Sequence, residues 1–190
     1  MQRVFLIHGW TGSPTNDFFP WAKENLQKAG YEVFIPEMPD PAYPKIVPWV
    51  KKIKQVVGKP RANDILVGHS LGCMGILHYL QTMPDDIKIG KVILIAGFEN
   101  LMDASFVALD DWETFRPWKK APINYGKIKN MVKSWTALFS DDDPYVSYED
   151  NHKIFESKLG AKIILEHGMG HFAQESGIRS LPILLELVRG

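Results

Sequence analysis

Apolar runs of strand length alternate along this chain with segments whose apolar residues recur at helical spacing. The strand candidates are mostly continuous apolar runs, such as VFLI, ILV, VILIA and KIIL, rather than alternating ones. Continuous runs are typical of strands that are buried on both faces of a parallel sheet. The pattern predicts strands at residues 3–7, 31–35, 64–68, 91–96, 134–139 and 161–165.

The segments between these strands have the caps, apolar faces and terminating glycines of helices. A helix after the first strand is predicted to start at a cap residue, Asn16 or Asp17, and to end at Gly30. The motif SYED, residues 147–150, is a capping box for a later helix that ends at Gly160. Further helices are predicted from apolar residues at 46, 50, 53 and 57, from those at 71, 74, 77 and 80, and over residues 181–188.

Alternation of strand and helix predicts an α/β fold. We expect a three-layer sandwich in which a mostly parallel sheet of about six strands has helices on both faces. The whole chain, residues 1–190, is expected to form a single domain. Residues 98–130 break the alternation and are too long for a plain connection, which indicates an extra helix or a short lid-like insertion.

Composition and charge exclude several classes of protein. Hydrophobic residues make up 45% of the 190, enough for a sizeable core. Lysine plus arginine and aspartate plus glutamate are 22 each, so no basic face for nucleic acid is indicated. No apolar stretch is long enough for a membrane span or a signal peptide. The single cysteine, Cys73, excludes an intrachain disulfide and predicts a cytoplasmic location.

A serine lies between two glycines where the predicted strand 64–68 passes into a helix, in the sequence Gly68-His69-Ser70-Leu71-Gly72. G-x-S-x-G in this setting is typical of a nucleophile elbow, a turn so tight that the flanking glycines must lack side chains. Ser70 is then expected at the carboxyl edge of the sheet, above a helix start that favours negative charge. An ordinary glycine-rich turn is the alternative. A phosphate cradle is disfavoured because no G-x-G-x-x-G motif or Walker lysine lies near.

A serine hydroxyl needs a base, and in this architecture the base comes last along the chain. Four histidines follow Ser70. His78 lies two turns along the elbow helix, and His152 lies within the helix capped at residue 147. His171 and the runner-up, His167, lie in EHGMGHF, a loop at the correct edge of the sheet.

The spacing of His167 and His171 also suits a pair of metal ligands on a helix. Gly168 and Gly170 between them argue against a helix, and no third ligand presents itself. We therefore predict no metal and no cofactor, and we assign the base to His171.

The orienting acid should follow the predicted strand 134–139, where the sequence is SDDDPYVS. Asp143 precedes Pro144, which favours an extended conformation and fixes the direction of the carboxylate. Asp143 is the candidate acid, whereas Asp141 and Asp142 are expected to shape the turn or face solvent. Three solvated loop acids remain the alternative.

The oxyanion of an acyl-transfer reaction needs two N–H donors. The residue after the nucleophile supplies one, Leu71, and the loop HGWTGSP after the first strand supplies the other, with Trp10 as candidate. For His8 we favour a structural hydrogen bond within its own loop. His69 is expected to point away from Ser70 and either to pack or to contact substrate.

Residues 98–130 bring aromatic residues and acids together. Trp112 and Trp118 are the candidate substrate-binding residues, since aromatic rings can wall an acyl pocket. The competing interpretation, which we favour, is that the aromatics pack on the sheet and the acids face water. So short a segment leaves little chain for a large lid, so we expect a shallow site and short acyl esters.

In chain order, the segments LIHGWTGSP, GHSLG, SDDDPYV and GHF resemble those of α/β-hydrolases. MPDP and RPW are similar to the small serine hydrolases related to retinoblastoma-binding protein nine, including bacterial members. The resemblance implies a hydrolase fold without the usual first two strands. It also implies Ser70 as nucleophile, Asp143 as acid and His171 as base, and esterase or aminopeptidase-like activity, with protein binding described for some members.

The sequence thus predicts a serine hydrolase that cleaves small ester or amide substrates through an acyl-enzyme, most simply a carboxylesterase. An aminopeptidase-like amidase is one alternative. A protein-binding module with a vestigial triad is the other. The expected partner is a small molecule rather than nucleic acid or membrane, and no feature of the sequence indicates a protein partner.

Overall fold

Six parallel strands form one sheet in the computed structural model, which describes residues 1–102 and 109–190. In sheet order the neighbours are β2-β1-β3-β4-β5-β6, and each adjacent pair is parallel. This confirms the predicted α/β fold. The strands are β1 (Arg3–Ile7), β2 (Glu32–Phe34), β3 (Ile65–His69), β4 (Ile89–Ile95), β5 (Val132–Ser140) and β6 (Lys162–Glu166).

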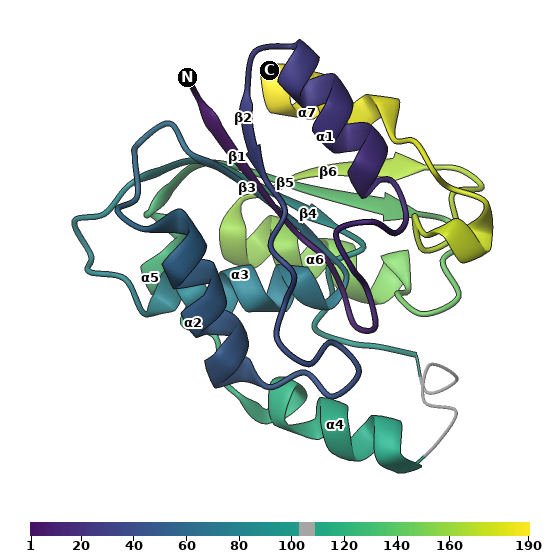
Figure 1. Cartoon of the computed structure of the whole chain (residues 1–190). Coiled ribbons are helices and arrows are strands. Elements are labelled where there is room, and N and C mark those ends of the chain that lie inside the picture. Colours follow the sequence, from purple (N-terminus) through teal and green to yellow (C-terminus); the bar gives the residue numbers. More distant parts are fainter. Residues whose placement is uncertain (103–108) are drawn as a thin grey trace.

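Helices cover both faces of this sheet. Helices α1 and α7 lie on one face, and α2, α3, α5 and α6 lie on the other (Figure 1). Their bounds are α1 Phe19–Lys28, α2 Ile46–Val57, α3 Leu71–Gln81, α5 Tyr125–Lys129, α6 Tyr148–Leu159 and α7 Pro182–Arg189. The three-layer arrangement follows from strands that are apolar on both sides and therefore need cover on both.

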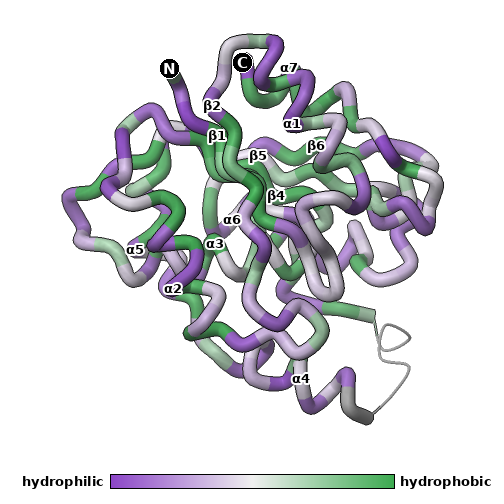
Figure 2. Tube along the Cα trace, in the orientation of Figure 1, coloured by the Kyte–Doolittle hydropathy of each residue, from purple (hydrophilic) through white to green (hydrophobic). Residues whose placement is uncertain are grey.

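Successive strand residues enter different cores, because side chains alternate across a strand. In β1, Phe5 and Ile7 pack with α2 and α3, whereas Val4 and Leu6 pack with α1 and α7. All four are buried. Both sets are apolar, which explains why the strands are continuous apolar runs in the sequence, and Figure 2 shows hydrophobic residues following the strands.

The ends of the helices match the sequence in most places. The cap at Ser147 is confirmed, since its hydroxyl accepts a hydrogen bond from the N–H of Asp150 at 3.2 Å. The predicted cap of the first helix is wrong: α1 begins at Phe19, and Phe18 is its N-cap without a side-chain bond. Asp17 instead accepts a hydrogen bond from the N–H of Gln174, far along the chain, at 2.9 Å.

The segment 98–130 contains helix α4 (Leu109–Lys120) as well as α5. Helix α4 lies beyond α2, at the edge of the molecule (Figure 1). Residues 103–108 of the segment lie outside the described residues, so the lid-like insertion stays a prediction. Within the described chain, no helix combines the length and apolar character that a membrane crossing requires.

Candidate active site

Ser70 occupies a strained turn between β3 and α3. Its backbone angles are φ 53° and ψ −124°, in a region that residues with a side chain seldom adopt. The N–H of Ser70 donates to the carbonyl of Ile95 at 2.9 Å, which anchors the turn to the end of β4. Such strain persists only where the surrounding structure holds it, and it concentrates at functional sites.

The two glycines of the motif are required by backbone close to them. A Cβ at Gly68 would lie 2.7 Å from the backbone N of Cys73. A Cβ at Gly72 would meet the carbonyl oxygen of Ile7 and lie 2.7 Å from that of His8. The geometry of a nucleophile elbow is therefore present, as the sequence predicts.

His171 and Asp143 form a buried pair. Nδ1 of His171 lies 2.8 Å from Oδ2 of Asp143, and their side chains are 10% and 2% exposed. The other carboxylate oxygen of Asp143 accepts hydrogen bonds from the N–H groups of Tyr145 at 2.9 Å and Val146 at 3.0 Å. With Nδ1 donating to the carboxylate, Nε2 of the neutral ring is left as an acceptor.

The neighbouring acids shape the turn, as expected. Oδ1 of Asp142 accepts from the hydroxyl of Ser140 at 2.6 Å and from the N–H of Gly170 at 2.7 Å. These bonds hold the pKa of Asp142 below its usual value. They tie the loop after β5 to the residue directly before His171.

His167, the runner-up for the base, faces a different acid. Its Nδ1 lies 2.6 Å from Oδ2 of Asp141, and its side chain is 78% exposed. The hydrogen bond to Asp141 raises the pKa of His167, and the same bond lowers the pKa of Asp141. His167 and His171 thus point to separate carboxylates, which disfavours a shared metal.

The loop after β1 lies directly against the serine. A Cβ at Gly9 would be 2.9 Å from the Cβ of Ser70, so the backbone before Trp10 runs past the hydroxyl. Leu71 is the first residue of α3, where a helix leaves its N–H groups unpaired. Among the described residues, neither the N–H of Trp10 nor that of Leu71 donates to a protein acceptor.

His8 has the structural role that we favoured. It is fully buried, its Nδ1 donates to the carbonyl of Gly9 at 3.0 Å, and its Nε2 accepts from the N–H of Met38 at 3.0 Å. Burial lowers the pKa of His8, so the ring stays neutral and keeps both bonds. Cys73 is likewise fully buried, and burial raises the pKa of its thiol.

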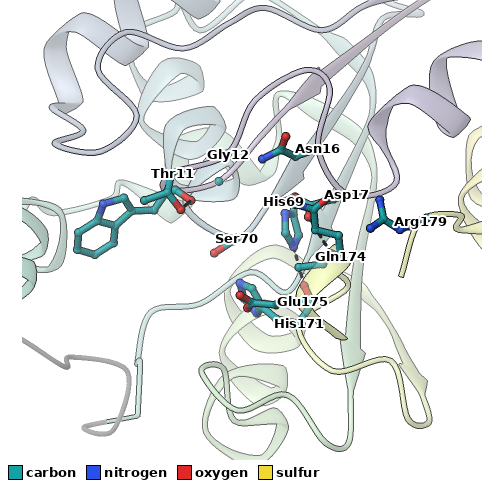
Figure 3. A pocket seen from close by; sticks show the side chains of 13 residues that line it. Thr11, Gly12, Asn16, Asp17, His69, Ser70, His171, Gln174, Glu175 and Arg179 are labelled. Carbon is teal, nitrogen blue, oxygen red and sulfur yellow. Dashed lines mark hydrogen bonds between the residues drawn. The ribbon is translucent and has the colours of Figure 1, made fainter. Parts of the chain in front are cut away.

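Two cavities meet at Ser70 and His171, which line both. The larger, about 420 Å³, is mainly polar and extends toward Asp17, Gln174 and Arg179, which Figure 3 shows gathered beyond His69. The smaller, about 290 Å³, is mainly apolar, and its further lining residues are Trp10, Thr11, Leu71, Phe98, Leu101, Asp111, Tyr145 and Glu175.

The structure places the predicted substrate-binding tryptophans away from both cavities. Trp118 is 1% exposed, and its indole N–H donates to the carbonyl of Pro44 at 2.9 Å, so this prediction is wrong. Trp112 packs near Phe115, with ring centroids 6.3 Å apart, and does not line either cavity. The favoured interpretation, packing aromatics, accounts for these rings.

Other residues take the place of the tryptophans. Phe98, Leu101 and Tyr145 form the apolar wall, and His69 lines the larger cavity while being only 4% exposed. Tyr145 follows Asp143 by two residues, a nearness to the acid that is visible in the sequence. For Asp17 and Arg179, which lie in loops, no comparable feature of the sequence indicates that they line the cavity.

A parallel sheet with a serine at the strained turn after its third strand, and a histidine–aspartate pair beside it, defines an α/β-hydrolase. The comparison with known proteins agrees. The chain belongs to the Serine hydrolase family, which it matches over residues 4–189.

Relatives support the same placement. The chain is 29% identical over 187 residues to YdeN of Bacillus subtilis (strain 168), a protein named as a hydrolase, covering 98% of this chain and 94% of the relative. The crystal structure of the ydeN gene product matches with a TM-score of 0.88 at 28% identity, over 100% and 97% of the two chains. Polyneuridine aldehyde esterase shares the fold, with a TM-score of 0.67 at 15% identity, over 97% and 96%.

Proposed function

We propose that this protein hydrolyses small carboxylic esters through an acyl-enzyme on Ser70. The observation that carries the proposal is the buried pair of His171 and Asp143, whose Nδ1 and Oδ2 lie 2.8 Å apart, with His171 lining the same cavity as the strained Ser70. A weak nucleophile, a base and an acid that orients the base are the parts that acyl transfer needs.

In the proposed first step, Oγ of Ser70 attacks the ester carbonyl while Nε2 of His171 takes the hydroxyl proton. The tetrahedral intermediate collapses, the bond to the alcohol oxygen breaks, and His171 returns the proton to that oxygen. Water then repeats the sequence on the acyl-enzyme and releases the carboxylic acid. Asp143 stays ionised throughout and stabilises the imidazolium that forms twice in each cycle.

Negative charge that develops on the carbonyl oxygen needs donors that are already in place. The N–H groups of Leu71 and Trp10 are the candidates, because both are without a protein acceptor among the described residues and both adjoin Ser70. The N-terminus of α3, directly after Ser70, adds the positive end of a helix dipole.

The cavities favour small substrates. A volume of about 290 Å³ on the apolar side suits a short acyl or a single aromatic group, rather than a long lipid chain. The name of polyneuridine aldehyde esterase, which shares the fold, is consistent with ester rather than amide cleavage. The experiment below therefore compares esters with amides.

The test is hydrolysis of a panel of p-nitrophenyl esters of increasing acyl length beside aminoacyl amides. We expect the protein to turn over the short esters. The Asp143→Asn variant should lower kcat by about 10³- to 10⁴-fold, because the asparagine amide no longer holds the required tautomer of His171. Asp142→Asn makes the same chemical change one residue away and should cost less than about tenfold.

Equal kcat for the two asparagine variants would contradict the role of Asp143. Efficient turnover of the amides with no turnover of the esters would move the protein to the amidase class. A protein that cleaves neither substrate series would contradict the proposed reaction.

A further inference from the structure

His69, the last residue of β3, connects the serine turn to the backbone of His171. Its Nε2 lies 2.7 Å from the carbonyl oxygen of His171, 102 residues along the chain. A carbonyl oxygen can only accept, so Nε2 carries the proton and donates it. The residue directly before Ser70 therefore holds the main chain that carries the His171 ring.

This hydrogen bond does not depend on the protonation of His69 near pH 7. Burial lowers the pKa of His69 to about 3, so the ring is neutral near pH 7. A neutral imidazole has one N–H, and the carbonyl of His171 fixes it on Nε2. The donor is thus always present.

Aromatic packing fixes the direction of this donor. The His69 ring meets Phe18 edge-on, with centroids 5.6 Å apart, and Phe19 at 6.2 Å. It also lies 5.1 Å from the ring of His171. With these contacts on several sides, the imidazole has little freedom to turn away from the carbonyl.

The loop that carries His171 needs such support. Gly170 and Phe172, on either side of His171, have φ values of 51° and 55°, and for Phe172 this is a strained conformation. Asp143 holds the His171 ring through Nδ1, and Asp142 holds the N–H of Gly170. His69 holds the carbonyl of His171 itself.

We propose that His69 is a positioning residue, whose hydrogen bond to the His171 carbonyl sets the approach of the imidazole to Ser70. The proposal rests on the proposed function, because it gives His69 a part in a proton transfer that His171 carries out. It makes the hydrogen bond to His171, rather than substrate contact, the reason for His69 in the motif.

The test compares His69→Leu, which removes the donor, with His69→Gln, whose side-chain NH₂ can donate to the same carbonyl. On p-nitrophenyl butyrate we expect His69→Leu to lower kcat by about 10- to 100-fold, because a displaced base costs rate rather than binding, while KM stays within about twofold. His69→Gln should recover kcat to within about threefold of the wild type.

His78→Leu is the matched control, since it makes the same change at another buried histidine, one that lines neither cavity. It should leave kcat within about twofold of wild type at temperatures well below melting. If His69→Leu does not fold, His69→Asn replaces it, because its shorter amide falls short of the carbonyl.

Folded His69→Leu or His69→Asn with wild-type kcat would overturn the positioning role, as would an equal loss of kcat in His78→Leu. A change in KM alone would mean that His69 contacts the substrate instead of positioning His171. Wild-type protein without any ester or amide turnover would instead contradict the proposed function, and with it the reaction that His69 serves.

Discussion

The Ser70→Ala variant is expected to lose ester hydrolysis by about 10⁶-fold, to the level at which only residual binding effects accelerate the reaction. In the proposed reaction the hydroxyl oxygen of Ser70 bonds to the acyl group, so no other contact of the site replaces it. Alanine has the same Cβ as serine and fits the strained turn equally well, so the melting temperature should not change. Steady-state kinetics on a short p-nitrophenyl ester and a thermal melt measure both effects.

Ser157→Ala is the matched control for this variant. Ser157 lies on α6 and bonds to carbonyls of its own helix, away from both cavities. It should keep full activity. Ester cleavage that survives Ser70→Ala, in protein that melts as the wild type does, would remove Ser70 from the reaction.

The largest effect on stability is expected for Gly72→Ala. The new Cβ would press on the carbonyl oxygens of Ile7 and His8, which belong to the backbone at the end of β1 and cannot swing aside as a side chain can. Relief requires α3 to move away from the sheet, so we expect the free energy of unfolding to fall by about 3 kcal/mol. Urea unfolding followed by circular dichroism measures the loss.

Gly75→Ala, one turn further along α3, is the matched control. Its Cβ would lie 3.3 Å from Cδ1 of Ile53 and 3.5 Å from the ring of Trp49, both side-chain atoms with room to adjust. Alanine also favours the helix, by about 1 kcal/mol, so the two effects should nearly cancel. Equal stability of the two alanine variants would mean that α3 does not pack on the end of β1 as described.

The features that the sequence predicts well depend on local sterics or on the regular pattern of apolar residues along the chain. The strands could be predicted because their two buried faces leave continuous apolar runs. Gly68 and Gly72 indicated the elbow because only glycine fits there. Asp143 could be distinguished from its neighbours because a proline follows it, and its carboxylate does meet His171.

The parts that the sequence did not predict depend on contacts between distant segments. Asp17 was expected to cap a helix, yet its carboxylate binds the N–H of Gln174, 157 residues away. Trp118 was a candidate for the substrate cavity, yet the chain turns its indole inward to the carbonyl of Pro44. A tryptophan on a helix suits a core and a cavity wall equally well, and only the packing of α4 decides between them.

Covalent labelling tests whether Ser70 is the activated nucleophile of this hydrolase. Native protein is treated with a fluorophosphonate, digested, and mapped by mass spectrometry, with urea-unfolded protein as the control. We expect one adduct per chain, on the peptide that contains Ser70, and no adduct once the fold is lost. Native protein that stays unlabelled, or that carries its adduct on another residue, would contradict this role of Ser70.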